Sequence, residues 1–259
     1  MKSKIRKTAL ILLSVLFWFA LWEIIARIVD SRVILPTASE TLRTLWHLLF
    51  KAEFYTSIFF SFVRIFIGFL LGFIIGVVSG ILTNHSKVFD YIISPIMTVA
   101  RSTPVASIII ILWFIVGESF FLGKDGIPII IGALMVMPVI YQSTYNGLSN
   151  TSEMLCEVGF VFEFNWIKKV RYIIFPSLRK FLIPGLLTST GLAWKAGIAA
   201  EIITLTKNSI GKNISNAKNS WEGAEMLAWT LTVIFLSIII ESTLKYFLKK
   251  TQINENDNQ

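Results

Sequence analysis

The sequence predicts an all-α membrane protein that crosses the bilayer six times. Of its 259 residues, 54% are hydrophobic and only 15% are charged, and the mean hydropathy is +0.70. A soluble domain of this composition would lack the polar side chains needed to cover its surface. Because one helical crossing takes about 20 apolar residues, the chain has room for one membrane domain and none for a separate catalytic domain.

Six apolar runs are long enough to be crossings, and they cover residues 9–29, 58–83, 88–117, 126–145, 181–205 and 222–247. The first run is too long for the core of a signal peptide and lacks a small-residue cleavage site, so we expect it to be retained. The third run exceeds the length of one crossing, and Arg101 and Pro104 predict a break within it. An even number of crossings places both termini on one side.

The runs divide the chain into three regions. Residues 1–57 hold the first membrane helix and an extracytoplasmic amphipathic connector, with a turn at Pro36 and Thr37 and a helix over about 40–50. Residues 58–248 form the membrane core, and residues 249–259 form a polar cytoplasmic tail. Most lysines and arginines outside the runs fall on the side of the N-terminus, which predicts cytoplasmic termini. The net charge of +8 then reflects sidedness rather than a nucleic-acid partner.

Composition also limits the chemistry. The single cysteine, Cys156, excludes an internal disulfide, a multi-cysteine zinc site and an iron–sulfur cluster. Two histidines, His47 and His85, are too few for a haem or di-metal centre. We therefore expect no catalytic residue and no metal ligand.

A glycine stripe runs through the second apolar run, at Gly68, Gly72, Gly76 and Gly80. Residues four apart share one helix face, and glycine on that face lets another backbone approach closely. The stripe therefore predicts a helix–helix contact face rather than part of a conduction path.

Among the ionisable residues within or at the edge of the runs, five are singled out: Glu23, Arg64, Arg101, Lys195 and Glu201. Each costs about 2.5 to 3.5 kcal/mol to place in lipid, so each is expected to face protein or water. For Glu23 and Arg64 we favour an interhelical ion pair or snorkelling. The other three are equally compatible with structural anchoring and with a solute path. Lys195 and Glu201 lie six residues apart and point in different directions, so we expect their partners on other helices.

Pro104 in the sequence Arg101-Ser102-Thr103-Pro104 removes a backbone donor and frees carbonyls at membrane depth. Such backbone is tolerated only against protein or a water-filled path. The candidates for lining that path are Arg101, Ser102, Thr103, Lys195 and Glu201.

The segment 151–184 carries the most specific motif. Glu157-Val158-Gly159 is followed by Glu163 and then, after nine residues, by Ile173-Ile174-Phe175-Pro176. This spacing resembles the EAA loop of membrane subunits in ATP-binding-cassette importers, in which Glu-Ala-Ala precedes a glycine and then Ile-x-Leu-Pro. Glu157, Ile173 and Pro176 match the pattern, and Val158 and Gly159 replace its alanines. Glu163 stands where the family has glycine, at the turn between two short helices, and glutamate adopts a left-handed conformation less easily than glycine.

Other stretches resemble the nitrate, sulfonate and taurine branch of these permeases, and together they cover about 35–248. They are Leu35-Pro36-Thr37-Ala38, Ser61-Phe62-Val63-Arg64, Arg101-Ser102-Thr103-Pro104, Leu112-Trp113-Phe114-Ile115-Val116-Gly117, Gly191-Leu192-Ala193-Trp194 and Ala200-Glu201.

The resemblance implies a type I ABC importer permease fold, with six membrane helices and a short cytoplasmic coupling helix in an EAA-type loop at about 151–180. It also implies a homodimer in a bacterial-type cell membrane, an extracytoplasmic solute-binding protein, and a separate ATPase docked at Glu157, Val158, Gly159, Glu163, Ile173 and Pro176. The sequence has no phosphate-binding Gly-x4-Gly-Lys-Ser/Thr loop, so ATP is expected on the partner and no cofactor on this chain.

Arg101 and Lys195 suit a small anionic solute such as nitrate, a sulfonate or taurine, although Glu201 or Glu23 would neutralise that charge equally well. Two alternatives belong to other classes. A self-contained secondary transporter needs an acidic coupling site at the midplane and an internal repeat, and the sequence offers Glu201 and Glu23 without a clear repeat. A membrane enzyme needs clustered carboxylates or a nucleophile with its base, and the acids here are scattered.

Overall fold

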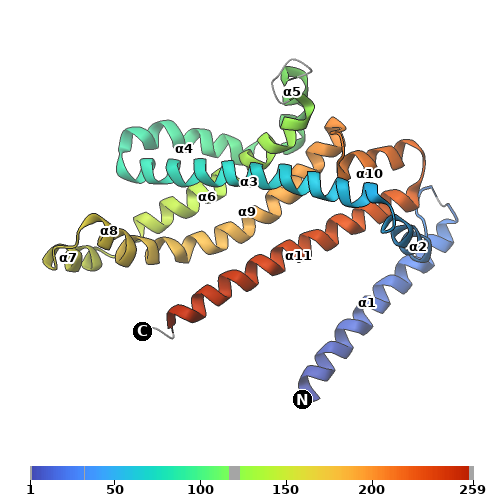
Figure 1. The fold of residues 1–259 in the computed structure, drawn as a ribbon, viewed down its shortest axis with the longest axis horizontal. Coiled ribbons are helices and arrows are strands. Elements are labelled where there is room, and N and C mark those ends of the chain that lie inside the picture. Colours follow the sequence, from blue (N-terminus) through green and yellow to red (C-terminus); the bar gives the residue numbers. More distant parts are fainter. Residues whose placement is uncertain (1, 32, 117–122, 257–259) are drawn as a thin grey trace.

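The computed structural model describes residues 2–31, 33–116 and 123–256. Within these ranges the chain is almost entirely helical (Figure 1). The helices are α1 (Lys2–Val29), α2 (Ala38–Leu48), α3 (Ala52–His85), α4 (Lys87–Ser102), α5 (Val105–Val116), η1 (Gly123–Gly126), α6 (Ile127–Ser149), α7 (Glu153–Val161), α8 (Trp166–Lys169), η2 (Val170–Ile174), α9 (Phe175–Thr204), α10 (Ile210–Asn219) and α11 (Gly223–Asn256).

Four helical segments in the described residues are long and apolar enough to cross a membrane: Leu12–Val29, Ala52–His85, Gly123–Ser149 and Gly223–Leu248. The pair α4 and α5 counts as a fifth if its two helices form one broken span. α9 covers the predicted run 181–205 but carries Lys195 and Glu201 and is not among these segments. Six crossings therefore remain a prediction.

The third apolar run breaks where Arg101 and Pro104 predict. α4 ends at Ser102, α5 begins at Val105, and their axes differ by 103°. The physical reason is that Pro104 has no N–H and disfavours helical geometry in the residue before it. α4 lies beside α3 and α5 turns away from both (Figure 1), so the run is not one straight helix.

The glycine stripe lies in the contact between α3 and α6. A Cβ atom added at Gly72 would stand 2.5 Å from the carbonyl oxygen of Ala133, and one at Gly68 would stand 2.5 Å from that of Ile129. Gly76 and Gly80 meet α6 in the same way at Ile140 and Thr144. Because the two backbones are this close, no larger residue fits the stripe without moving a helix.

Gly72→Ala is therefore expected to destabilise the folded protein by about 1–3 kcal/mol, the usual effect of overpacking. Gly132→Ala is the matched control, since its added Cβ would lie 3.5 Å from Gly68, an ordinary contact. The measurement is the unfolding temperature of each purified variant in detergent. Equal unfolding temperatures for the two variants would show that the stripe is not a close contact.

The main core joins α3, α6 and α9 to the shorter helices. Ile65, Ile140 and Trp194 are buried in it, and the Trp194 indole nitrogen donates a hydrogen bond to the Val233 carbonyl of α11. By contrast, only 6% of the apolar segment of α1 is buried, so α1 is solvated by lipid or covered by another chain.

The two ends of the molecule differ in their helices. α7 and α8 lie at one end, beyond α6 and α9, whereas α2 and α10 lie at the other (Figure 1). Two boundaries differ from prediction. α10 forms between the predicted runs 181–205 and 222–247, and α11 continues to Asn256, because residues 249–256 hold no glycine or proline to stop it.

Candidate functional site: intramembrane charges and the α7 turn

Glu201 lies in a closed polar network between α9, α3 and α10. Its carboxylate is fully buried and accepts a hydrogen bond of 2.7 Å from the Ser61 hydroxyl and one of 3.3 Å from the Gly211 N–H. The Ser61 oxygen in turn accepts the Ile210 N–H at 3.0 Å. Glu201 and Ser61 therefore each accept one backbone N–H at the N-terminus of α10, where a negative charge is favourable.

Arg64 completes this network from α3. Its guanidinium is 3.5 Å from the second carboxylate oxygen of Glu201, which confirms the predicted interhelical ion pair. Arg64 also donates hydrogen bonds to the carbonyls of Lys207, at 2.6 Å, and Asn208, at 3.4 Å. The Lys207 N–H donates to Asp125 on η1. These contacts hold the turn between α9 and α10 against α3 and η1.

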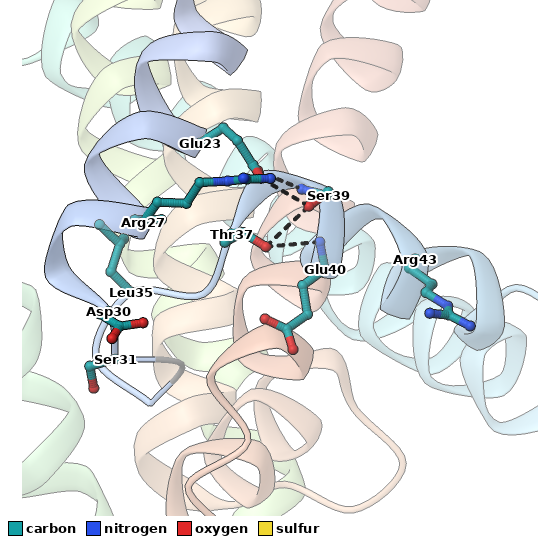
Figure 2. A pocket seen from close by; sticks show the side chains of 10 residues that line it. Glu23, Arg27, Asp30, Ser31, Leu35, Thr37, Ser39, Glu40 and Arg43 are labelled. Atoms are coloured by element: carbon teal, nitrogen blue, oxygen red, sulfur yellow. Dashed lines mark hydrogen bonds and ion pairs between the residues drawn. The ribbon is translucent and has the colours of Figure 1, made fainter.

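Glu23 is partnered at the junction of α1 and α2. Its carboxylate pairs with Arg27 at 2.9 Å within the same helix and accepts the Ser39 N–H at 3.1 Å (Figure 2). The ion pair is thus intrahelical, and hydrogen bonds to Ser39 make the link between helices. Thr37 caps α2 by accepting the Glu40 N–H, so the turn lies where Pro36 and Thr37 predict it. A pocket of about 600 Å³ opens beside these residues.

Arg101 and Lys195 differ from the three charges above. Both side chains are exposed, and neither makes a hydrogen bond or an ion pair with any residue in the described ranges. The partner that we expected for Lys195 on another helix is therefore not found in the described residues. A cation at membrane depth without a partner must face water, a solute or another chain.

Ser102 and Thr103 end α4 beside Arg101. Both hydroxyls donate to the Val99 carbonyl, at 3.2 and 2.7 Å, so they satisfy the end of their own helix. Their second lone pairs remain available to a neighbour.

Arg101 opens onto a pocket of about 340 Å³ formed by the end of α4, α6 and α9. Four uncharged polar residues that the sequence did not single out line it: Gln142, Ser143, Asn146 and Thr188. The available signal was weak, because it was only the four-residue spacing of Gln142 and Asn146 at the end of an apolar run. Thr188 is seven residues before Lys195, so the two share one face of α9.

The α7 turn, residues 159–166, has a left-handed glutamate at its centre. α7 ends at Val161, Glu163 has φ of 47°, and the next amide, Phe164, donates to the Gly159 carbonyl at 2.8 Å. The Glu163 N–H donates to Phe160, which completes the double hydrogen-bond pattern that commonly ends a helix. Asn165 then caps α8 by accepting the Lys168 N–H.

Gly159 and Ile173 pack together beneath this turn. Both are buried, and a Cβ atom at Gly159 would stand 2.7 Å from the Ile173 Cδ1. Pro176 is the second residue of α9, which continues directly from η2. Ile173, on η2, thus anchors the turn next to the start of α9.

The outer surface of α7, the α7 turn and the start of α8 is apolar and open. Glu157 and Val158 are exposed, and so are several large side chains: Met154, Phe160, Val161, Phe162, Trp166 and Ile167. Phe160 is 86% exposed. An apolar patch rimmed by glutamates is typical of a protein–protein contact.

Glu163→Gly is expected to stabilise the α7 turn by about 1 kcal/mol, because glycine enters the left-handed region without the cost paid by a residue with a Cβ. Limited proteolysis at residues 160–167 should slow by about fivefold, as that free energy implies. Glu163→Ala removes the carboxylate but keeps the Cβ, and should give no such slowing. Equal protection by both substitutions would assign the effect to charge instead.

Comparison with known proteins identifies the family of the chain. Residues 68–253 match the family described as "Binding-protein-dependent transport system inner membrane component". The chain is also 26% identical over 235 residues to the "Putative aliphatic sulfonates transport permease protein SsuC" of Bacillus subtilis (strain 168). That match covers 89% of this chain and 82% of the relative. The resemblance seen in the sequence is thereby confirmed, and the chain belongs to the binding-protein-dependent transport inner membrane components, as a multi-pass ABC transporter permease and not an enzyme.

Proposed function

We propose that the chain is the membrane subunit of an ATP-driven importer and pairs with a second copy around the solute path. The carrying observation is that Arg101 and Lys195, which the sequence predicts to lie at membrane depth, are exposed and have no partner in the described chain. Closing a second copy over this face would remove both cations from lipid and enclose them with water and solute. Six crossings with both termini cytoplasmic complete the arrangement.

The solute proposed is a small anion of the nitrate, sulfonate and taurine group, delivered by an extracytoplasmic binding protein. Two cations on the path favour a negative charge, since Glu201 and Glu23 are already engaged by Arg64, Ser61, Arg27 and Ser39. A relative that is named for the transport of aliphatic sulfonates supports the same class. The engagement of both acids also weighs against a secondary transporter, which would need one of them for a coupling ion.

The α7 turn is the proposed docking element for the ATPase. Its apolar surface around Phe160 and Phe162, rimmed by Glu153, Glu157 and Glu163, suits a groove on a partner. ATP binding would draw the docked turns together, and movement of α9 and of the break at Pro104 would expose the path to alternate sides. ATP itself binds to the partner.

Arg101→Ala and Lys195→Ala are each expected to lower ATP-dependent uptake by about tenfold or more without releasing the ATPase, because a charge-assisted contact to the solute is lost. Uptake is measured in vesicles that contain the complete transporter, and ATPase retention by co-purification. Lys87→Gln, at the other end of α4, is the control. Undiminished uptake by both alanine variants would make these cations structural anchors.

A further inference from the structure

The pocket beside Arg101 combines a polar side with an apolar side. Arg101, Gln142 and Asn146 supply polar groups from α4 and α6, whereas Val139 and Phe181 supply apolar walls. Its volume of about 340 Å³ exceeds what a bare inorganic anion fills and suits a small organic molecule.

In the described chain the polar side of the pocket has donors without an acceptor on Arg101 and Asn146, and one acceptor without a donor, the side-chain oxygen of Gln142. The Gln142 amide donates to the Asn146 side-chain oxygen at 2.8 Å, which leaves the Asn146 amide nitrogen as a donor with no protein acceptor. The Arg101 guanidinium is likewise without an acceptor. A guanidinium and an amide donor together match a group that carries negative charge and several acceptor oxygens.

The hydroxyls in the pocket do not compete for those donors. Ser143 donates to the Val139 carbonyl at 2.9 Å, and Thr188 donates to the Pro184 carbonyl at 3.0 Å, both within their own helices. The remaining wall is formed by Val139, Phe181 and Pro184, which offer no charge to a second ionic group. A cationic group placed there would be desolvated without a partner.

We propose that this pocket is a transient subsite for a short alkyl oxyanion, with the anionic head held by Arg101 and Asn146 and the alkyl part against Val139 and Phe181. The inference rests on the proposed function, and it narrows the solute within that group. Nitrate has no alkyl part to fill the apolar side, and the ammonium group of taurine would lie against it. The subsite therefore favours an unsubstituted alkanesulfonate over both.

The single native cysteine allows a direct test. In a Cys156→Ser background, Thr188→Cys places one thiol in the pocket of the assembled transporter in detergent. Each labelling rate is divided by the rate of the same reagent with a small free thiol, because a thiolate reacts intrinsically faster with a cationic reagent than with an anionic one. On this normalised scale we expect the anionic reagent 2-sulfonatoethyl methanethiosulfonate to label the pocket thiol about tenfold faster than its cationic trimethylammonium counterpart, because Arg101 concentrates anions locally. Arg101→Gln should bring the two rates together, whereas Lys87→Gln, an exposed cation on the same helix, should leave their ratio unchanged.

Protection by solutes then tests the shape of the site. Butanesulfonate should slow labelling at concentrations at which sulfate and taurine do not, and Asn146→Leu should abolish that protection. Equal labelling by the two reagents, absence of labelling, or equal protection by all three solutes would overturn the subsite. Uptake by the same protein distinguishes a failure of the subsite from a failure of the proposed function. If ATP-dependent uptake proceeds while the pocket shows no anion preference, only the subsite is wrong; if the preference holds but the complete transporter accumulates no solute, the proposed function is wrong.

Discussion

Glu157→Lys is expected to abolish solute uptake while leaving the permease folded in the membrane. Glu157 lies exposed on α7, at the rim of the apolar surface formed by Phe160 and Phe162. Reversing a charge at the rim of a docked surface introduces repulsion in a contact of which the central residues are worth about 2–4 kcal/mol each, which corresponds to about 30- to 1,000-fold in affinity. The ATPase should therefore dissociate from the variant, and uptake should fall with it.

Two measurements check this expectation: co-purification of the ATPase, and uptake by reconstituted vesicles. Glu222→Lys provides the matched control, because Glu222 is an exposed glutamate just before α11, far along the chain from α7. It should retain both the ATPase and uptake. A Glu157→Lys permease that keeps its ATPase and its uptake would remove the docking role from α7. Gly159→Trp should act like Glu157→Lys by a separate route, since its side chain would displace Ile173 beneath the turn.

Arg64→Met is the substitution with the largest expected effect on stability. Glu201 is fully buried, and Arg64 is its ion-pair partner at 3.5 Å. Removing one member of a buried pair leaves an uncompensated charge and typically costs about 3–5 kcal/mol. The variant also loses the hydrogen bonds from Arg64 to the Lys207 and Asn208 carbonyls, so the turn between α9 and α10 should loosen.

A double variant separates the cost of the uncompensated Glu201 charge from the cost of the lost Arg64 hydrogen bonds. Glu201→Gln in the Arg64→Met background removes the orphaned charge and keeps an oxygen to accept from Ser61 and Gly211, so it should recover most of the lost stability. Unfolding temperatures of the two single variants and the double variant in detergent form the required cycle. If the double variant is no more stable than Arg64→Met, the pair contributes little and the Arg64 hydrogen bonds to the turn dominate.

The main helices were predictable because apolar runs and glycine spacing report on a single helix. The run 58–83 lies within α3, the break at Pro104 separates α4 from α5, and the stripe from Gly68 to Gly80 faces α6. Each of these follows from spacing along one segment. The left-handed turn at Glu163 was indicated only through the family resemblance, because glutamate itself gives no turn signal.

The turn between α9 and α10 was not predictable from local sequence. Leu205 and Asn208 both have positive φ, at 54° and 46°, and a leucine in that conformation is held by tertiary contacts rather than by its own preference. Those contacts come from Arg64, which donates to the carbonyls of Lys207 and Asn208, 143 and 144 residues later in the chain. Ser61 gave no signal of its own, because serine is common in membrane helices at packing positions.

The pocket beside Arg101 was missed for a related reason. It joins residues of α4, α6 and α9, and the spacing within one helix carries no information about which faces meet. Glu241 is a further ionisable residue within an apolar run that sequence reasoning passed over. It lies in α11, 3.7 Å from Lys245 one turn later, so it has a local partner.

The central claim is that this chain supplies a gated path and that a separate ATPase supplies the work. Its most direct test is solute accumulation in sealed vesicles containing the purified permease, with and without the ATPase and the binding protein. The account predicts accumulation only when both partners and ATP are present, and none with the permease alone under any ion gradient. Uphill accumulation by the permease alone would contradict it.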